Sequence, residues 1–440
     1  MIETLEQELD SFDAGCRGRA LRQLAALAEE GKVAFRAPGD RVNMHCHTFF
    51  SYNSYGYSPS RFAWQSRKEG LALAGIVDFD VLDGLDEFIE AGRLLGLRTC
   101  GGLETRVFVP EFADKVMTSP GEPGITYHMG VGFPAGRLTG RLKAFQEALK
   151  QTAQQRNREL VQRVNAYLKP AELNYERDVL PLTPAGNATE RHICLAYARK
   201  AAAAFAGPAL ERFWSDKLGA DAAKLGLPEG RDLLNTIRNK TMKRGGVGYV
   251  QPDAGAFPRM AETNAFVLKA GGIATLTWLN GQSEGERDME RLLATAMATG
   301  VEAVNIIPDR NFTPGVRDEL LVNLNSFITL ACAHDLPIVV GTEMNSPGQR
   351  FVDQFDKAEL KPHVPVFLKG ARVVYAHCVL QRRCGLGYSG RWATRHFPRR
   401  VDRNRFFERV GMFVDPRAED RLDGLNDDTL PAEILRRLGA

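Results

Sequence analysis

The sequence predicts an α/β fold built around a parallel sheet that is open or closed as a barrel. Short apolar runs alternate with helical patterns along most of the chain, and one long, purely helical segment interrupts this alternation. Polar residues suited to catalysis follow several of the apolar runs. Strands that alternate with helices pair in parallel, and the carboxyl ends of parallel strands form the functional face of such folds.

Eight apolar runs have the length of strands. Helical periodicity separates most of them; Leu320, Leu324 and Phe327, for example, lie on one stripe shortly before Pro337. The predicted strands cover residues 42–45, 74–79, 98–103, 127–133, 272–278, 303–307, 337–342 and 372–376.

The same pattern divides the chain into segments. Residues 1–40 are expected to be helical, and residues 136–250 form several predicted helices without a strand, which indicates an inserted helical subdomain. The two flanking segments, 41–135 and 251–349, are predicted to form the first and second halves of the barrel. After residue 349 the pattern loosens, so 350–440 is interpreted as an Arg-rich extension of loops and short helices.

Composition places the chain among ordinary globular proteins, with 44% hydrophobic and 25% charged residues. No apolar run approaches the about 20 residues of a membrane-spanning helix, and the acidic opening segment does not resemble a signal peptide. Seven cysteines without regular spacing indicate free thiols in a reducing compartment. We therefore expect a cytoplasmic protein with no membrane partner; the sequence gives no signal for an oligomeric state.

The net charge of +3 hides a strong asymmetry along the chain. Residues 136–250 contain 20 Lys and Arg against 11 Asp and Glu, and residues 381–409 contain nine Arg against two acidic residues. Basic segments that flank acidic ones suit a metal site that acts on an anionic substrate. The alternative for each single Arg is a solvated helix face.

Histidines and carboxylates collect at the ends of the predicted strands. His45 and His47 close the first strand, Asp78 the second, Glu104 the third and Glu343 the seventh. Alternate residues of a strand point the same way, so both imidazoles of an HxH pair can reach one ion. Imidazole together with carboxylate suits Zn, Mn or Fe. The spacing therefore predicts a metal site on the face formed by the strand ends.

These motifs resemble those of PHP (polymerase and histidinol phosphatase) domains, and order and spacing agree over residues 43–349. The resemblance implies a distorted (β/α)7-type PHP barrel with an inserted helical subdomain. Residues 188–193 and 270–273 are similar to further segments of PHP phosphoesterases. The four motifs LHxH, TDH, GxE and HxLG of the front half are matched by residues 43–47, 77–79, 102–104 and 128–130, and GSDxH by residues 341–345.

The resemblance implies a reduced metal site with one or two divalent ions. The ligands of the first ion are retained as His45, His47, Glu104 and Glu343, the last one methylene longer than the Asp usual in the family. His128 matches a ligand of the second ion, which would share Glu104. The third ion has lost its ligands, because Tyr52, Phe79 and Asn345 stand at the matching positions. His377, which follows the predicted strand 372–376, is a further candidate ligand; the alternative is that it packs beneath the Arg-rich extension.

The function implied is that of a phosphoesterase that hydrolyses a small phosphorylated metabolite or nucleotide with a hydroxide generated at the metal. Asp78 and His192 are the expected catalytic residues, although Asp78 has the alternative role of orienting a ligand imidazole. Arg191, His192 and Asn345 are the expected substrate contacts. Two other hypotheses stay open: a metal-dependent hydrolase or lyase of a non-phosphate substrate, and a degenerate barrel that binds nucleic acid or regulates another protein.

Overall fold

The computed structural model describes residues 1–252 and 254–440 and contains one seven-stranded sheet whose strand order follows the sequence. All neighbouring strands pair in parallel except β4, which runs antiparallel to both β3 and β5. The strands are β1 (Val42–Cys46), β2 (Leu73–Phe79), β3 (Arg98–Phe108), β4 (Ile125–Val131), β5 (Ile273–Trp278), β6 (Ala303–Ile306) and β7 (Ile338–Val340).

The sheet curls until its two edges meet. Cys46, at the end of β1, forms an isolated parallel bridge with Glu343, which follows β7. Glu343 donates its backbone N–H to the carbonyl of His45, and His47 donates its backbone N–H to the carbonyl of Glu343, each over 2.8 Å. The result is a nearly closed seven-stranded barrel, as expected from the sequence; the reversed direction of β4 was not part of the prediction.

Helices cover the outside of the barrel and connect the parallel strands. α3 shows why one of them forms here: Ser58 accepts a hydrogen bond from the Arg61 N–H and Pro59 fills the first turn, a favourable helix start. α4 ends where Gly96 adopts a left-handed conformation with φ of 67°. The helices of this layer are α3 (Pro59–Lys68), α4 (Leu85–Leu95), α9 (Met260–Lys269), α10 (Glu284–Arg287), α11 (Met289–Ala298) and α12 (Arg317–Ala333), and α1 (Ile2–Glu8) and α2 (Ala14–Glu29) lie over α3 and α4.

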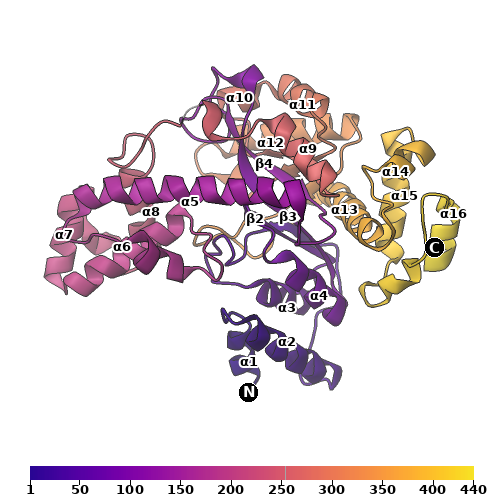
Figure 1. Cartoon of the computed structure of the whole chain (residues 1–440), viewed down its shortest axis with the longest axis horizontal. Helices are drawn as coiled ribbons and strands as arrows, with labels where there is room; N and C mark the ends of the chain where they lie inside the picture. The colour runs from indigo at the N-terminus through magenta and orange to yellow at the C-terminus, as the bar shows by residue number, and fades with distance from the viewer. Residues whose placement is uncertain (253) are drawn as a thin grey trace.

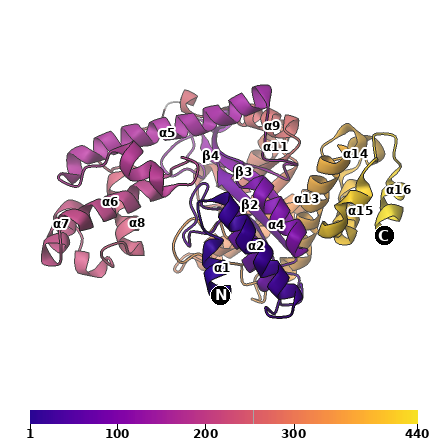
Figure 2. The ribbon, with the colours of Figure 1, turned by 60° about the horizontal axis from the view of Figure 1, so that its bottom comes forward.

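Between β4 and β5 the chain forms a helical lobe that lies to one side of the barrel (Figures 1 and 2). Its helices are α5 (Gly140–Leu168), α6 (Glu190–Ala204), α7 (Pro208–Leu218) and α8 (Arg231–Thr241). Because β4 is reversed, α5 starts at the opposite end of the barrel from the HxH pair, and its 29 residues extend over about 43 Å. The lobe has a hydrophobic core of its own, which includes Val164, Ile193, Tyr197, Trp214 and Ile237.

The C-terminal part contains a long helix where the sequence predicted a strand. Residues 372–376 lie inside α13 (Val364–Cys384), so the prediction of an eighth strand is wrong. α13 crosses the amino-terminal end of the barrel: Gly370 approaches Ile338 at the start of β7, and Gly132 and Gly271 lie beside His377. Helices α14 (Arg391–His396), α15 (Arg400–Phe413) and α16 (Pro431–Leu438) pack beyond it (Figure 2).

No helix of the described residues combines the length and the apolar character that crossing a bilayer requires.

Candidate metal centre

Three side chains meet inside the barrel at the carboxyl end of its parallel strands. His45 and His47 extend from the end of β1, and Glu104 lies on β3. The Glu104 Oε2 atom is 3.6 Å from the His45 Nε2 atom and 3.2 Å from the His47 Nε2 atom. All three side chains are at most 2% exposed, and their ligand atoms lie within 4.8 Å of one another.

The three facing atoms are buried without a hydrogen bond. The Nε2 atoms of both histidines and Oε2 of Glu104 have no partner of acceptable geometry among the described residues. A buried polar atom without a partner costs about 1–3 kcal/mol, and three such atoms rarely converge in a structural core. Two imidazole nitrogens and a carboxylate oxygen form a set that suits a divalent transition metal, so the residues present fit such an ion.

The charge of this cluster is set by Glu104. Burial opposes its ionisation, but the nearby imidazoles of His45 and His47 outweigh burial and lower the pKa of Glu104 to about 2. Burial likewise opposes protonation of His45, yet the neighbouring Glu104 raises the pKa of that imidazole. Glu104 is therefore ionised at neutral pH, and its carboxylate attracts a cation.

The rings of His45 and His47 are each held by a contact to the Nδ1 atom. The Nδ1 atom of His45 lies 3.0 Å from Oδ1 of Asn305 on β6. The Nδ1 atom of His47 lies 3.1 Å from the hydroxyl of Ser51, which donates to Asp78 over 2.7 Å. Such contacts fix the ring and leave Nε2 to face an ion.

Asp78 accepts two further hydrogen bonds at 2.7 Å, from the backbone N–H and the hydroxyl of Thr48. Its side chain is buried, and the recorded contacts tie it to the loop after β1. This geometry favours the orienting role of Asp78, which acts on His47 through Ser51, over the role of general acid or base.

Glu343 lies beside the cluster but turns away from it. Its Oε2 atom accepts hydrogen bonds from Arg310 Nε (3.0 Å), Arg310 Nη2 (2.7 Å) and Gln349 Nε2 (3.0 Å). Arg310 belongs to the short helix η6 (Pro308–Phe312) after β6. In the described structure the group suited to a metal thus contains three of the four residues expected for the first ion, and Glu343 is bound to Arg310 instead.

His128 faces the wrong side of the sheet for the expected second ion. Glu104 pairs with Met129 on β4, whereas His128 pairs with Thr105, so the side chains of Glu104 and His128 point to opposite faces. The His128 Nε2 atom contacts Asn264 on α9 at 2.5 Å, and burial lowers the pKa of His128 to about 4. The prediction that His128 and Glu104 share an ion is contradicted by this register.

Tyr127 occupies the inner position instead. It pairs with Arg106, two residues after Glu104 on β3, so these side chains face the same side as the cluster. Thr277 and Asn305, which pair between β5 and β6, complete this inner face, and the Thr277 hydroxyl is buried without a partner. The inner positions of β4 and β5 are thus occupied by the phenol of Tyr127 and the hydroxyl of Thr277. A second ion would need imidazole ligands at these positions.

His377 lies at the other end of the barrel. Its Nε2 atom contacts the Gly271 carbonyl at 2.9 Å, and its Nδ1 atom accepts the Tyr388 N–H over 2.9 Å. Both ring nitrogens are therefore used, and burial lowers the pKa of His377 to about 4. The prediction of a metal ligand is wrong because the apolar run before His377 is helical, and the alternative of a packed histidine agrees with the structure.

The insertion brings Arg191 and His192 to the rim of this face. Arg191 donates to Asn235 on α8 (2.6 Å) and to Ser346 in the loop after β7 (3.0 Å). His192 accepts the Thr189 N–H at 3.1 Å as part of a capping box, and burial lowers its pKa to about 3. Its ring packs edge-on against Tyr52, with centroids 5.0 Å apart.

Aromatic side chains line the approach to the cluster. Phe79 stacks on His47 with centroids 4.3 Å apart, and its ring lies 6.2 Å from that of Tyr127. Asn345, an expected substrate contact, is partly exposed in the loop after β7 and has no recorded side-chain hydrogen bond among the described residues. Its role stays a prediction.

Four residues of the site were not identified from the sequence. Asn305 lies near the end of β6 and Arg310 follows it; neither β5 nor β6 had a predicted site residue, and the position of these two residues at a strand end was the available signal. Ser51 lies within the loop next to the HxH pair, and Tyr127 was masked by the neighbouring His128. Only the register of β4 shows that Tyr127, and not His128, faces the inside of the barrel.

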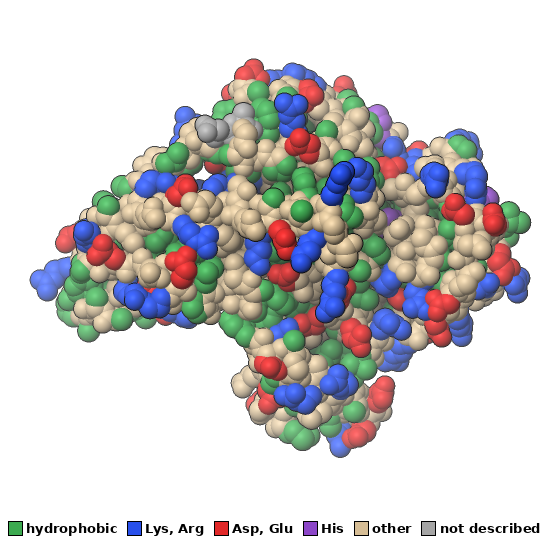
Figure 3. Space-filling model, viewed as in Figure 1, with side chains coloured by type: hydrophobic (Ala, Val, Ile, Leu, Met, Phe, Trp, Pro, Cys, Tyr) green, Lys and Arg blue, Asp and Glu red, His purple; other side chains and the backbone are tan. Residues whose placement is uncertain are grey.

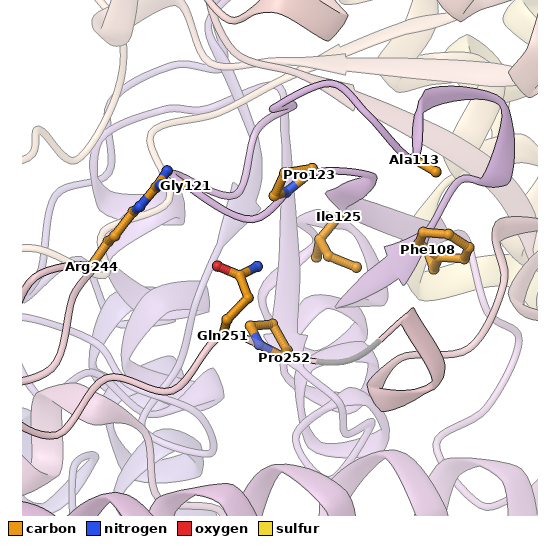
Figure 4. A pocket seen from close by; sticks show the side chains of 8 residues that line it. All are labelled: Phe108, Ala113, Gly121, Pro123, Ile125, Arg244, Gln251 and Pro252. Atoms are coloured by element: carbon orange, nitrogen blue, oxygen red, sulfur yellow. The ribbon is translucent and has the colours of Figure 1, made fainter.

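Two cavities lie outside this cluster. One of about 360 Å³ lies between the β3–β4 connection and the segment after α8, and Arg244 is its one charged lining residue (Figure 4). Among the described residues, no residue that lines this cavity forms a hydrogen bond or an ion pair with His45, His47 or Glu104. We assign it no role.

Comparison with known proteins gives distant structural similarities only. No family model and no curated protein matches the chain. An amidohydrolase from Chromobacterium violaceum, solved with sulfate and no metal, is 17% identical with a TM-score of 0.47, and the match covers 70% of this chain and 88% of that one. A protein from Bifidobacterium adolescentis, proposed to be a metal-dependent phosphoesterase, is 18% identical with a TM-score of 0.46, covering 75% and 98%. Both similarities are too distant to assign an activity to this chain.

Proposed function

We propose that the protein is a metal-dependent hydrolase whose ion is held by His45, His47 and Glu104. The observation that carries this proposal is the convergence of three buried ligand atoms without hydrogen bonds. A core that had lost its ion would have little reason to keep these atoms facing one another at the cost of their hydrogen bonds. The proposed ion is Zn, Mn or Fe, and Tyr127 and Thr277 favour one ion over two.

A divalent cation held by these residues would lower the pKa of water to about 7 and would polarise an oxygen of the substrate. The chain provides the rest of the site. Asn305 and the Asp78–Ser51 pair hold the two imidazoles in place, and the aromatic rings of Phe79 and Tyr127 limit access of water from one side. His192 is neutral at pH 7 because of its low pKa, so it binds as a hydrogen-bonding group and not as a cation.

For the substrate we propose a phosphate ester of a small metabolite or nucleotide. Two positively charged side chains support this proposal. The Arg310 side chain is 41% exposed at the same end of the barrel as the cluster, and Arg191 lies at the rim of that end. Interaction with Glu343 raises the pKa of Arg310, which therefore stays charged at any relevant pH. A guanidinium presents a fork of N–H donors that matches phosphate oxygens.

Arg191 and His192 lie in the first turn of α6, the end of the helix at which its dipole favours an anion. Arg191 already donates to Asn235 and Ser346, however, whereas among the described residues Glu343 is the only group to which the Arg310 side chain donates. We therefore propose Arg310 as the main phosphate contact and Arg191 as a contact that also holds the insertion against the barrel.

The nucleic-acid hypothesis finds less support. Of the nine arginines in residues 381–409, five form ion pairs within the described structure: Arg382 with Glu419, Arg383 with Asp423 and Arg403 with Glu302, for example. On the face shown in Figure 3, basic and acidic side chains alternate over this region and form no continuous basic surface. A phosphate backbone is bound by clustered free cations, which this face does not offer.

The proposal is tested by metal analysis of protein purified without chelator, together with a panel of phosphomonoesters, carboxylic esters and amides. We expect about one ion per chain and release of phosphate, both lost in Glu104→Gln. The matched control is His334→Asn, which removes an exposed histidine outside the site. Metal binding with hydrolysis of only esters or amides would replace the phosphate substrate with the non-phosphate alternative, and absence of metal would refute the proposal.

A further inference from the structure

One contact at the site is at odds with the ligand set that the sequence predicts. Glu343 has its main chain fixed next to both histidines, because its N–H and carbonyl bond to the backbone of His45 and His47. Its side chain nevertheless points to Arg310, with all three recorded hydrogen bonds on Oε2. No hydrogen bond of Oε1 is recorded among the described residues.

The backbone at this point is unusual as well. Glu343 and Met344 both have positive φ, +61° and +54°, which costs non-glycine residues of order 1–3 kcal/mol each. Strained backbone of this kind persists where the surrounding structure imposes it, here through the bonds to β1. The main chain of Glu343 is therefore held in one place, and only the side chain is free to choose between Arg310 and the cluster.

The two possible partners compete for one carboxylate. Arg310 is 41% exposed, whereas the Glu343 side chain is 5% exposed, so the guanidinium lies on the solvent side and the carboxylate beneath it. A cation among His45, His47 and Glu104 would attract the carboxylate inward, and an anion arriving from solvent would attract the guanidinium outward. Each event weakens the same ion pair.

We propose that the Arg310–Glu343 pair is a latch that couples the two binding events: an anion releases Glu343 to the metal, and the metal releases Arg310 to the anion. This inference rests on the proposed metal site. Metal and anionic substrate then bind with positive cooperativity, since whichever binds first has already broken the pair that the second must break. By thermodynamic linkage, the anion strengthens metal binding by the same factor as the metal strengthens anion binding.

Gln349 contributes a third donor to the outward state and accepts the Ser346 N–H over 2.8 Å, so the loop after β7 also supports the latched arrangement.

The test is a titration of metal-free protein with Mn²⁺, in the absence and presence of saturating inorganic phosphate, followed by calorimetry. In the unmodified protein we expect phosphate to lower the Mn²⁺ dissociation constant about tenfold. In Arg310→Gln the dissociation constant without phosphate should already be about tenfold lower, and phosphate should change it by less than about twofold. Glu343→Gln should lose the phosphate effect although Arg310 is intact.

Two comparisons separate the latch from simple electrostatics. Arg350→Gln removes an exposed arginine, paired with Asp309, that makes no recorded contact with Glu343, and it should behave like the unmodified protein. In a double-mutant cycle, the gain from Arg310→Gln should vanish in a Glu343→Gln background, because the carboxylate is what Arg310 withholds.

The outcomes are distinct. Unchanged Mn²⁺ affinity in Arg310→Gln, a gain that persists in the double variant, or a full phosphate effect in Glu343→Gln would overturn the latch. If the unmodified protein binds no Mn²⁺, Zn²⁺ or Fe²⁺ at all, the proposed metal site itself fails, irrespective of the latch. Thermal unfolding curves of each variant verify that affinity is compared between folded proteins.

Discussion

Replacing Glu104 and replacing His128 should have opposite consequences for metal binding and stability. The pKa of Glu104 falls from an ordinary 4.5 to about 2, which corresponds to about 3 kcal/mol in favour of the ionised carboxylate. Glu104→Gln removes the one anionic ligand of the cluster and should weaken metal binding by about 100-fold, since contacts behind the ligands alone contribute about 10–100-fold. The amide is isosteric, so the fold should be retained.

His128→Asn tests the register of β4. The His128 imidazole contacts Asn264 and not the cluster, so the variant should lose about 1–3 kcal/mol of stability from a broken buried hydrogen bond and keep its metal affinity. Competition with a chromogenic chelator measures the affinities, and urea unfolding measures the stabilities. A loss of metal affinity in His128→Asn equal to that in Glu104→Gln would refute the assignment of the two side chains to opposite faces.

Two further changes test other parts of the site, and a third tests His377 at the opposite end of the barrel. Ser51→Ala removes the link between Asp78 and His47 and should lower metal affinity about tenfold in the same competition assay, whereas unchanged affinity would show that His47 is oriented without it. Arg191→Ala should leave metal content intact and speed hydrogen exchange at the start of α6, because the bonds to Asn235 and Ser346 are lost; equal exchange rates would contradict that attachment. Burial lowers the pKa of His377 to about 4 against 6.5 in the unfolded chain, so its contribution to stability is complete above pH 6.5 and declines as the pH falls from about 6.5 to about 4, by about 1 kcal/mol over the first unit. Urea unfolding at pH 6.5 and 5.5 measures this loss, and His377→Gln should reduce it.

The sequence was sufficient for the barrel because hydrophobic patterning reports strands directly. The predicted run 74–79 differs from β2 by one residue, and all seven strands of the barrel were expected. The run before His377 failed because a short apolar segment with Val373 and Val374 fits a strand or a buried helix equally well. The structure places it within 21 helical residues that are buried between the barrel end and α15.

The cluster of His45, His47 and Glu104 was predictable for a different reason. Two histidines in alternation on one strand must share a face, and that constraint is local. The position of His128 was not predictable, because it depends on the direction and register of β4 against β3, which no neighbouring residue reveals. The partner of Glu343 was equally hidden, since Arg310 is 33 residues away and belongs to another strand end.

The barrel cannot close until its last strand, β7, has been synthesised. The bond between Asn43 and Thr342 spans 299 residues, whereas His45, His47 and Glu104 are all present once the first quarter of the chain has been synthesised. At about 5–20 residues per second, tens of seconds of translation separate the first ligands from Glu343. During that interval the edge of β1 has no β7 to pair with, and an unpaired edge strand invites association with other chains. The nascent chain is thus most exposed to misassembly before β7 has been synthesised. Molecular chaperones that bind nascent chains would be expected to protect the edge of β1.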